Sequence, residues 1–207
     1  IIDFAVQKYG ERVQDSLAAW HAKADGECAI DYGFHQIIGG VNDDSLKAMD
    51  ELVDEGITSF KLFMAYPGVF YSDDGQVLRA MQTAANNGAT IMMHAENGIA
   101  IDVLVQQAIA AGNTDPRFHG LTRPWETEAE ATNRAIMIAD MAGVPLYVVH
   151  VSCEQSHEAI RRARQKGMRV YGEPLIQHLL LDEGEYAHDD WDHAARRVMS
   201  PPFRNQQ

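Results

Sequence analysis

The strongest constraint on the fold of this chain is a regular alternation of short apolar runs with longer helical patterns. The apolar runs are rich in β-branched and aromatic residues, and several are nearly continuous, as expected of strands buried on both faces. Such alternation predicts an α/β protein with a parallel sheet. Six runs are predicted to be strands: Ile1–Ala5, Ala29–Ile37, Ser59–Ala65, Ala89–His94, Pro145–Val151 and Met168–Gly172.

Helical patterns fill the segments between these runs. Asp43 and Ser152 are the expected N-caps, and the Asp73–Asp74 pair suits a helix start or a loop. Five glycines stand where helices are expected to end, namely Gly56, Gly88, Gly112, Gly143 and Gly167. Two longer polar loops are expected, at Asn113–Trp125 and Asp182–His193. The predicted helices are Arg12–Lys23, Asp44–Glu55, Gln76–Asn87, Ile99–Ala111, Glu126–Ala142 and Glu154–Gln165.

Six βα units fit either a doubly wound open sheet or a barrel. Neither GxGxxG nor GxxxxGK[ST] follows any predicted strand, so the sequence carries no nucleotide-binding fingerprint. A complete (β/α)8 barrel takes about 250 residues, and six units are about three-quarters of one. The strand count therefore keeps a partial barrel open beside the open sheet.

The composition narrows the classes of partner. The chain has 207 residues, 46% of them hydrophobic, and a formal net charge of −13, which is typical of a globular protein that binds neither nucleic acid nor an anionic membrane. No apolar run approaches the ~20 residues that cross a bilayer. Cys28 and Cys153 lie in apolar runs without a paired motif, so both are expected to be buried and reduced, as in a cytoplasmic protein.

Polar residues inside or at the ends of three predicted strands point to chemistry. Lys61 lies within an apolar run, and His94 and His150 end two consecutive strands. Neighbouring parallel strands are ~4.8 Å apart, so the two imidazoles should converge, as Zn²⁺ ligands do. A lone strand-end histidine is more often a hydrogen-bonded core residue. A buried lysine must be paired with an acid, neutralised or modified.

At these residues the sequence resembles a known family. The runs FKLFMAY, MMHAENG, VVHVSCEQSHEAIRRAR, GEPLIQHLLLD and WDHAARRVMSPPFR resemble dihydropyrimidinases and D-hydantoinases, which are cyclic-amide hydrolases of the amidohydrolase superfamily. The resemblance covers essentially the whole chain. It implies a (β/α)8 barrel of the metal-dependent hydrolase kind that holds two divalent metal ions, usually zinc.

The resemblance also assigns roles to individual residues. Lys61 matches the carboxylated lysine that bridges both metals, and His94 and His150 match the histidine ligands of strands five and six. Tyr66 matches the tyrosine that hydrogen-bonds the substrate carbonyl and the developing oxyanion. Ser200 matches a serine whose backbone contacts the ring amide. The implied reaction is attack of a metal-bridging hydroxide on a ring amide carbonyl.

If Lys61 lies on strand four, residues 1–207 are the central part of one catalytic barrel, about strands 2 to 7. The first and eighth strands, with the HxH pair and the aspartate that complete the site, and any flanking β-sandwich domain are then expected to be absent. The isolated segment is expected to be inactive. The full protein is expected to be a cytoplasmic homotetramer of pyrimidine catabolism that opens dihydropyrimidines or 5-substituted hydantoins. Alternatives are a non-catalytic scaffold or oligomerisation homologue and a related cyclic amidohydrolase such as allantoinase.

Other polar residues are expected to lie outside the site. The run His188–His193 is expected to be a solvated loop, His157 a surface residue, and His119 a loop residue facing away from the site. His178 could help to shape the site without being a ligand. Three acidic residues at a helix start are expected only to favour the helix dipole: Glu126, Glu128 and Glu130.

Overall fold

The computed structural model describes residues 1–205 and contains one six-stranded sheet. Every pair of neighbouring strands is parallel, and the order in space is the order in sequence. All six predicted strands are therefore confirmed, although most are shorter than predicted. The strands are β1 (Ile2–Val6), β2 (Gly33–Ile37), β3 (Ser59–Phe63), β4 (Thr90–His94), β5 (Leu146–Val148) and β6 (Val170–Gly172).

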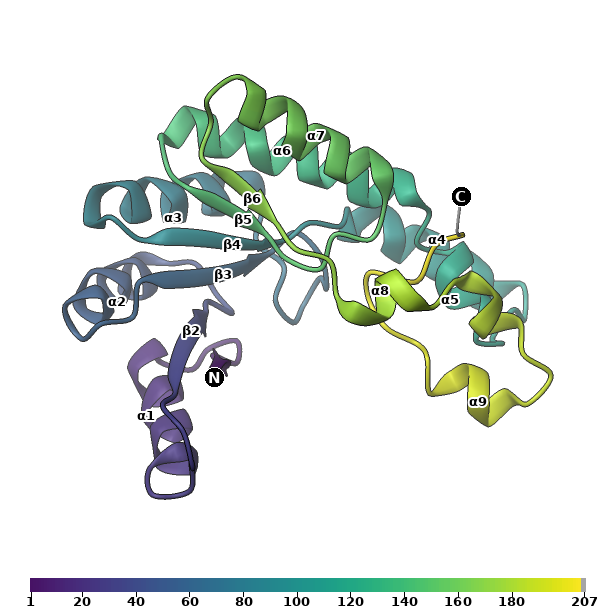
Figure 1. Ribbon diagram of the computed structural model, residues 1–207, viewed down its shortest axis with the longest axis horizontal. Coiled ribbons are helices and arrows are strands. Elements are labelled where there is room, and N and C mark those ends of the chain that lie inside the picture. Colours follow the sequence, from purple (N-terminus) through teal and green to yellow (C-terminus); the bar gives the residue numbers. More distant parts are fainter. Residues whose placement is uncertain (206–207) are drawn as a thin grey trace.

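Among the described residues, five helices lie along one side of the sheet between consecutive strands, whereas four others gather beyond the carboxyl ends of the strands (Figure 1). No helix within residues 1–205 is long and apolar enough to cross a membrane. The helices along the sheet are α1 (Val13–Ala24), α2 (Asp43–Asp54), α3 (Asp74–Asn87), α6 (Trp125–Ala142) and α7 (Glu154–Gln165). Those beyond the strand ends are α4 (Gly98–Ala110), α5 (Arg117–Leu121), α8 (Ile176–Leu180) and α9 (Trp191–Ala195), with a 3₁₀ turn, η1, at Glu183–Ala187.

The strand order distinguishes between the two architectures that the sequence left open. A doubly wound sheet reverses its strand order at a switch point and carries helices on both faces. Here the order runs β1 to β6 without reversal. Helices α2, α3, α6 and α7 pack against one another in succession on the same side of the sheet. The sheet is therefore singly wound, as the strands of a barrel are.

Alternation along the central strands separates the core from the opposite face of the sheet. Phe60 and Leu62 of β3 are fully buried in the hydrophobic core beneath the helices. Lys61 lies between them in sequence and Phe63 follows Leu62, so both alternate with the core residues and point to the other face. In β4, His94 is paired in register with Phe63, so it lies on the same face as Lys61. This face carries the polar residues that the sequence singled out.

Several local predictions were wrong for identifiable reasons. Asn42, not Asp43, caps α2, because its side chain accepts a hydrogen bond from the Ser45 amide in a capping box. The N-cap of α7 is Cys153, without a side-chain hydrogen bond, because Ser152 bonds elsewhere. Cys28 is exposed, since β2 begins only at Gly33.

The predicted polar loops also contain structure. Helix α5 lies within Asn113–Trp125, and η1 and the start of α9 lie within Asp182–His193. Other predictions hold: Asp73 caps α3, Cys153 is buried, and the five glycines named above all have positive φ. His157 is exposed, and His193 pairs with Glu185, so the His188–His193 run is confirmed as a largely exposed surface segment.

Candidate functional site

Lys61 is a nearly buried amine without an acidic partner. Its side chain projects from the middle of β3, and the residue is only 8% exposed. The Nζ atom lies 4.3 Å from the centre of the Phe4 ring and 4.9 Å from that of Phe63. Among the described residues no carboxylate lies within ion-pair distance of it. Within residues 1–205, therefore, no acid forms the ion pair that the alternative reading of Lys61 requires.

His94 and His150 meet at the carboxyl end of the sheet. His94 is the last residue of β4, and His150 follows β5 by two residues. Nδ1 of His94 lies 3.0 Å from Nε2 of His150, and the ring centres are 4.7 Å apart. The structure thus confirms that the two imidazoles converge. It brings Tyr66 to the same place, with its ring centre 4.9 Å from that of His94.

Glu96 fixes the orientation of His94. Its carboxylate Oε2 lies 2.8 Å from Nε2 of His94, and both side chains are at most 2% exposed. When the carboxylate is ionised, Nε2 must donate the hydrogen bond, which leaves Nδ1 with a free lone pair directed at His150. A carboxylate behind an imidazole is the usual means of orienting a metal-binding histidine. Sequence reasoning missed this role, although Glu96 stands in the HAEN motif.

Two residues of this site have an unusual backbone conformation. Within residues 1–205 only Tyr66, at φ 64°, and His150, at φ 45°, are non-glycine residues with positive φ. This conformation costs an L-amino acid about 1–3 kcal/mol, and such strain clusters at functional sites. Gly98 lies so close to Ala65, the residue before Tyr66, that a Cβ atom on Gly98 would stand 2.4 Å from Cα of Ala65. Close packing against the start of α4 therefore fixes the turn that contains Tyr66.

Burial sets the protonation of the central residues. It lowers the pKa of His94 to about 3, with Lys61 adding to the effect, and lowers the pKa of His150 well below its ordinary value. It lowers the pKa of Lys61 to about 8, against an opposing effect of Glu173. Burial and then Glu96 raise the pKa of Tyr66 to about 12. Two neutral imidazoles and a protonated phenol therefore face one space at neutral pH.

Ser200 approaches this space from a distant part of the chain. Its side chain lies close enough to the Tyr66 hydroxyl to oppose the rise in the pKa of that tyrosine. His119 lies 3.3 Å from Ser200 Oγ through its Nε2 atom, so the prediction that His119 faces away from the site was wrong. The structure thus brings four of the five predicted site residues close together, and Lys61 lies on the same sheet face below them.

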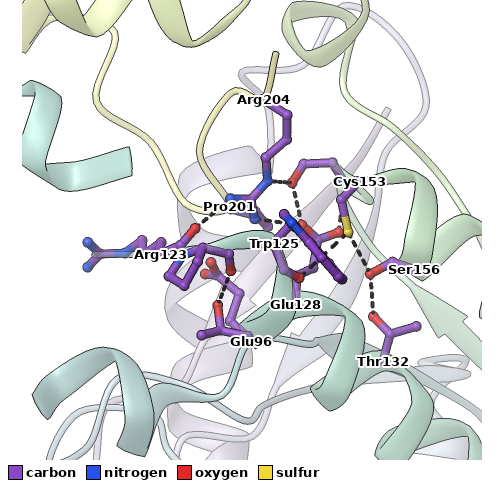
Figure 2. Close-up of polar contacts among 12 residues, drawn as sticks. Glu96, Arg123, Trp125, Glu128, Thr132, Cys153, Ser156, Pro201 and Arg204 are labelled. Carbon is purple, nitrogen blue, oxygen red and sulfur yellow. Dashed lines mark hydrogen bonds and ion pairs between the residues drawn. The ribbon is translucent and has the colours of Figure 1, made fainter. Parts of the chain in front are cut away.

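A buried ion pair ties the segment that follows Ser200 to the loop that follows His150 (Figure 2). Arg204 donates to Glu128 Oε2 at 3.0 Å and to Ser152 Oγ at 3.1 Å, and it also donates to the carbonyl of Arg123. Glu128 further accepts a hydrogen bond from the Ser152 amide at 2.8 Å. The view of Glu128 as only a dipole-favouring residue was therefore wrong, because its side chain is buried.

The donor set fits a divalent cation. Two imidazole ligands of a tetrahedral zinc ion lie about 3.3 Å apart, close to the 3.0 Å between His94 Nδ1 and His150 Nε2. Nδ1 of His150 is buried and has no hydrogen-bond partner within the described residues. No group of three His, Cys, Asp or Glu residues that could hold a metal ion occurs within residues 1–205. These residues could therefore supply only part of a coordination shell.

The fold and the site together define a class of protein, namely a singly wound parallel α/β protein with two adjacent histidines and a buried lysine on one face of the sheet. Over its whole length the chain is homologous to a segment of the D-hydantoinases and dihydropyrimidinases. It is 60% identical to a D-hydantoinase of Streptomyces coelicolor over 204 residues, covering 99% of this chain and 44% of that protein. No family model matches the chain.

Solved structures agree with the sequence comparison. A D-hydantoinase from a Bacillus species superimposes with a TM-score of 0.95 at 46% identity, over 99% of this chain and 45% of that one. A dihydropyrimidinase from Brevibacillus agri gives a TM-score of 0.95 at 45% identity, over 99% and 44%. The chain thus spans less than half the length of the relatives it matches.

Proposed function

We propose that this chain is the central part of a metal-dependent hydrolase that opens cyclic amides, either dihydropyrimidines or 5-substituted hydantoins. The convergence of His94 and His150 beside a buried, unpaired Lys61 is the observation that carries the proposal. We further propose that residues 1–207 form strands 2 to 7 of a (β/α)8 barrel. Its first and eighth strands, and any flanking β-sandwich domain, would then belong to other parts of the protein.

In this proposal Lys61, His94 and His150 hold two divalent metal ions, Zn²⁺ being the best match to imidazole nitrogen ligands. When bound, such ions polarise the amide carbonyl and generate a nucleophile from water at neutral pH. Lys61 would bridge them after carboxylation: its neutral amine adds to the carbon of CO₂, an N–C bond forms, and one proton leaves. The lowered pKa of Lys61 favours the neutral amine that this addition requires.

Tyr66 and Ser200 would act on the substrate. The Tyr66 hydroxyl stays protonated, so it can donate a hydrogen bond to the carbonyl oxygen as negative charge develops there. One such donor contributes about 3 kcal/mol to a barrier. Ser200 lies beside that hydroxyl, where its backbone could hold the ring amide and so orient the carbonyl toward Tyr66.

An assay of ring opening tests the proposal. The full protein should hydrolyse dihydrouracil or a 5-substituted hydantoin, lose the activity after treatment with a chelator, and regain it with added Zn²⁺. A protein that retains its metal yet opens neither ring, while it opens allantoin, would indicate the related activity. A protein that binds no metal and opens no ring would indicate a scaffold or oligomerisation homologue. A homotetramer and a cytoplasmic location remain expectations carried by the same resemblance.

A further inference from the structure

The backbone on each side of Ser200 accepts a hydrogen bond from a histidine. Nε2 of His119, in α5, lies 2.6 Å from the carbonyl oxygen of Met199. Nε2 of His178, in α8, lies 3.1 Å from the carbonyl oxygen of Pro201. The two histidines are 59 residues apart in sequence, yet they hold the carbonyls that flank one residue. We call His119 and His178 the histidine cradle.

The histidine cradle binds a stretch of chain that lies outside every helix and strand. Met199, Ser200 and Pro201 belong to no helix or strand, and within the described chain they make no backbone-to-backbone hydrogen bond. A carbonyl oxygen can only accept, so each imidazole must carry its proton on Nε2. Burial supports this neutral form: it lowers the pKa of His119 to about 4, with Arg123 adding to the effect, and it lowers the pKa of His178.

The cradle also links Ser200 to the rest of the candidate site. Nε2 of His119 lies 3.3 Å from Ser200 Oγ, and the Ser200 side chain lies close enough to the Tyr66 hydroxyl to affect the pKa of that tyrosine. Further along the chain, the Phe203 amide donates to the Tyr186 hydroxyl at 2.9 Å. The position of Ser200 relative to Tyr66 therefore depends on side-chain hydrogen bonds, and those of the cradle are the nearest to it.

We infer that His119 and His178 are positioning residues that set the Ser200 segment against the substrate ring, an inference that rests on the proposed cyclic-amide hydrolysis. Neither histidine is proposed to touch the reacting atoms. They act through the backbone of Met199–Pro201, so their loss should weaken recognition of the ring more than it slows the chemical step.

Amide variants of different reach test the cradle in the full protein. The side-chain nitrogen of glutamine can take the place of imidazole Nε2, whereas that of asparagine falls short by one methylene. His119→Asn should raise KM for the ring substrate about tenfold, the effect of losing one buried hydrogen bond. His119→Gln should stay within about threefold of the wild type. In both variants kcat and metal content should be unchanged. His157→Asn, at an exposed histidine, is the matched control.

Failure of the positioning role and failure of the proposed hydrolase function would give different results. Equal KM values for His119→Asn, His119→Gln and the wild type would overturn the positioning role. So would a fall in kcat with KM unchanged. If His119→Asn fails to fold, the same Asn and Gln pair at His178 carries the test with the same expectations. A wild-type protein that opens neither ring would overturn the proposed function itself.

Discussion

Removal of the Arg204 guanidinium should destabilise the protein far more than removal of a surface arginine. Arg204→Leu deletes hydrogen bonds to Glu128, Ser152 and the Arg123 carbonyl. It leaves the Glu128 carboxylate, whose side chain is 2% exposed, without its positive partner. Breaking a buried ion pair from one side costs about 3–5 kcal/mol, because an uncompensated charge stays buried.

Urea unfolding followed by circular dichroism measures this loss in the full protein. The matched control is Arg134→Leu, which removes an arginine that pairs with Glu130 on the same helix as Glu128. Arg134 also pairs with Asp74, and because Arg134 is 26%, Glu130 47% and Asp74 55% exposed, each of these two pairs should contribute no more than about 1 kcal/mol. The double variant Glu128→Gln/Arg204→Leu should be more stable than Arg204→Leu alone, since it buries no charge. Equal losses for Arg204→Leu and the control would show that the buried ion pair of Arg204 and Glu128 stabilises the protein no more than an exposed pair does.

Three further outcomes are expected. Iodoacetamide at pH 8 should modify the exposed Cys28 rapidly and Cys153 slowly, as peptide mass spectrometry would show, because burial raises the pKa of the Cys153 thiol to about 11. Equal rates would contradict the structure. Gly98→Ala should lower both thermal stability and activity, since its Cβ would collide with Ala65; an unaffected variant would show that the contact is absent. Tyr66→Phe should lower kcat by about 10²–10³-fold with metal content unchanged, as removal of an oxyanion donor does.

The sheet and its central polar residues were predictable from sequence because they depend on local patterns. Apolar runs and intervening helical patterns identified all six strands, and parallel neighbours necessarily bring the ends of consecutive strands together. Lys61 and His94 stood out because each is polar within an apolar run. The alternation of strands and helices alone could not distinguish a doubly wound from a singly wound sheet, since that choice concerns which face the helices cover; only the family resemblance indicated the barrel.

The residues that the sequence missed depend on distant partners. Glu128 has the same local setting as its exposed neighbour Glu130, and only the arrival of Arg204, 76 residues later, explains its burial. His119 could not be placed because its partner, Ser200, lies 81 residues further along the chain. Cys28 was misplaced because the apolar run after it begins four residues before the strand does. Local sequence patterns carry no information on the distant partners of Glu128 and His119 or on the exact residue at which a strand begins.

We propose that Lys61 supplies a bridging anion to a metal site shared with His94 and His150. The most direct test is the ring-opening rate of Lys61→Ala in the full protein, with and without an added short-chain carboxylic acid. We expect the variant to be inactive alone and to recover part of its activity when the free carboxylate replaces the missing bridge. Full activity of Lys61→Ala without any added acid would contradict it.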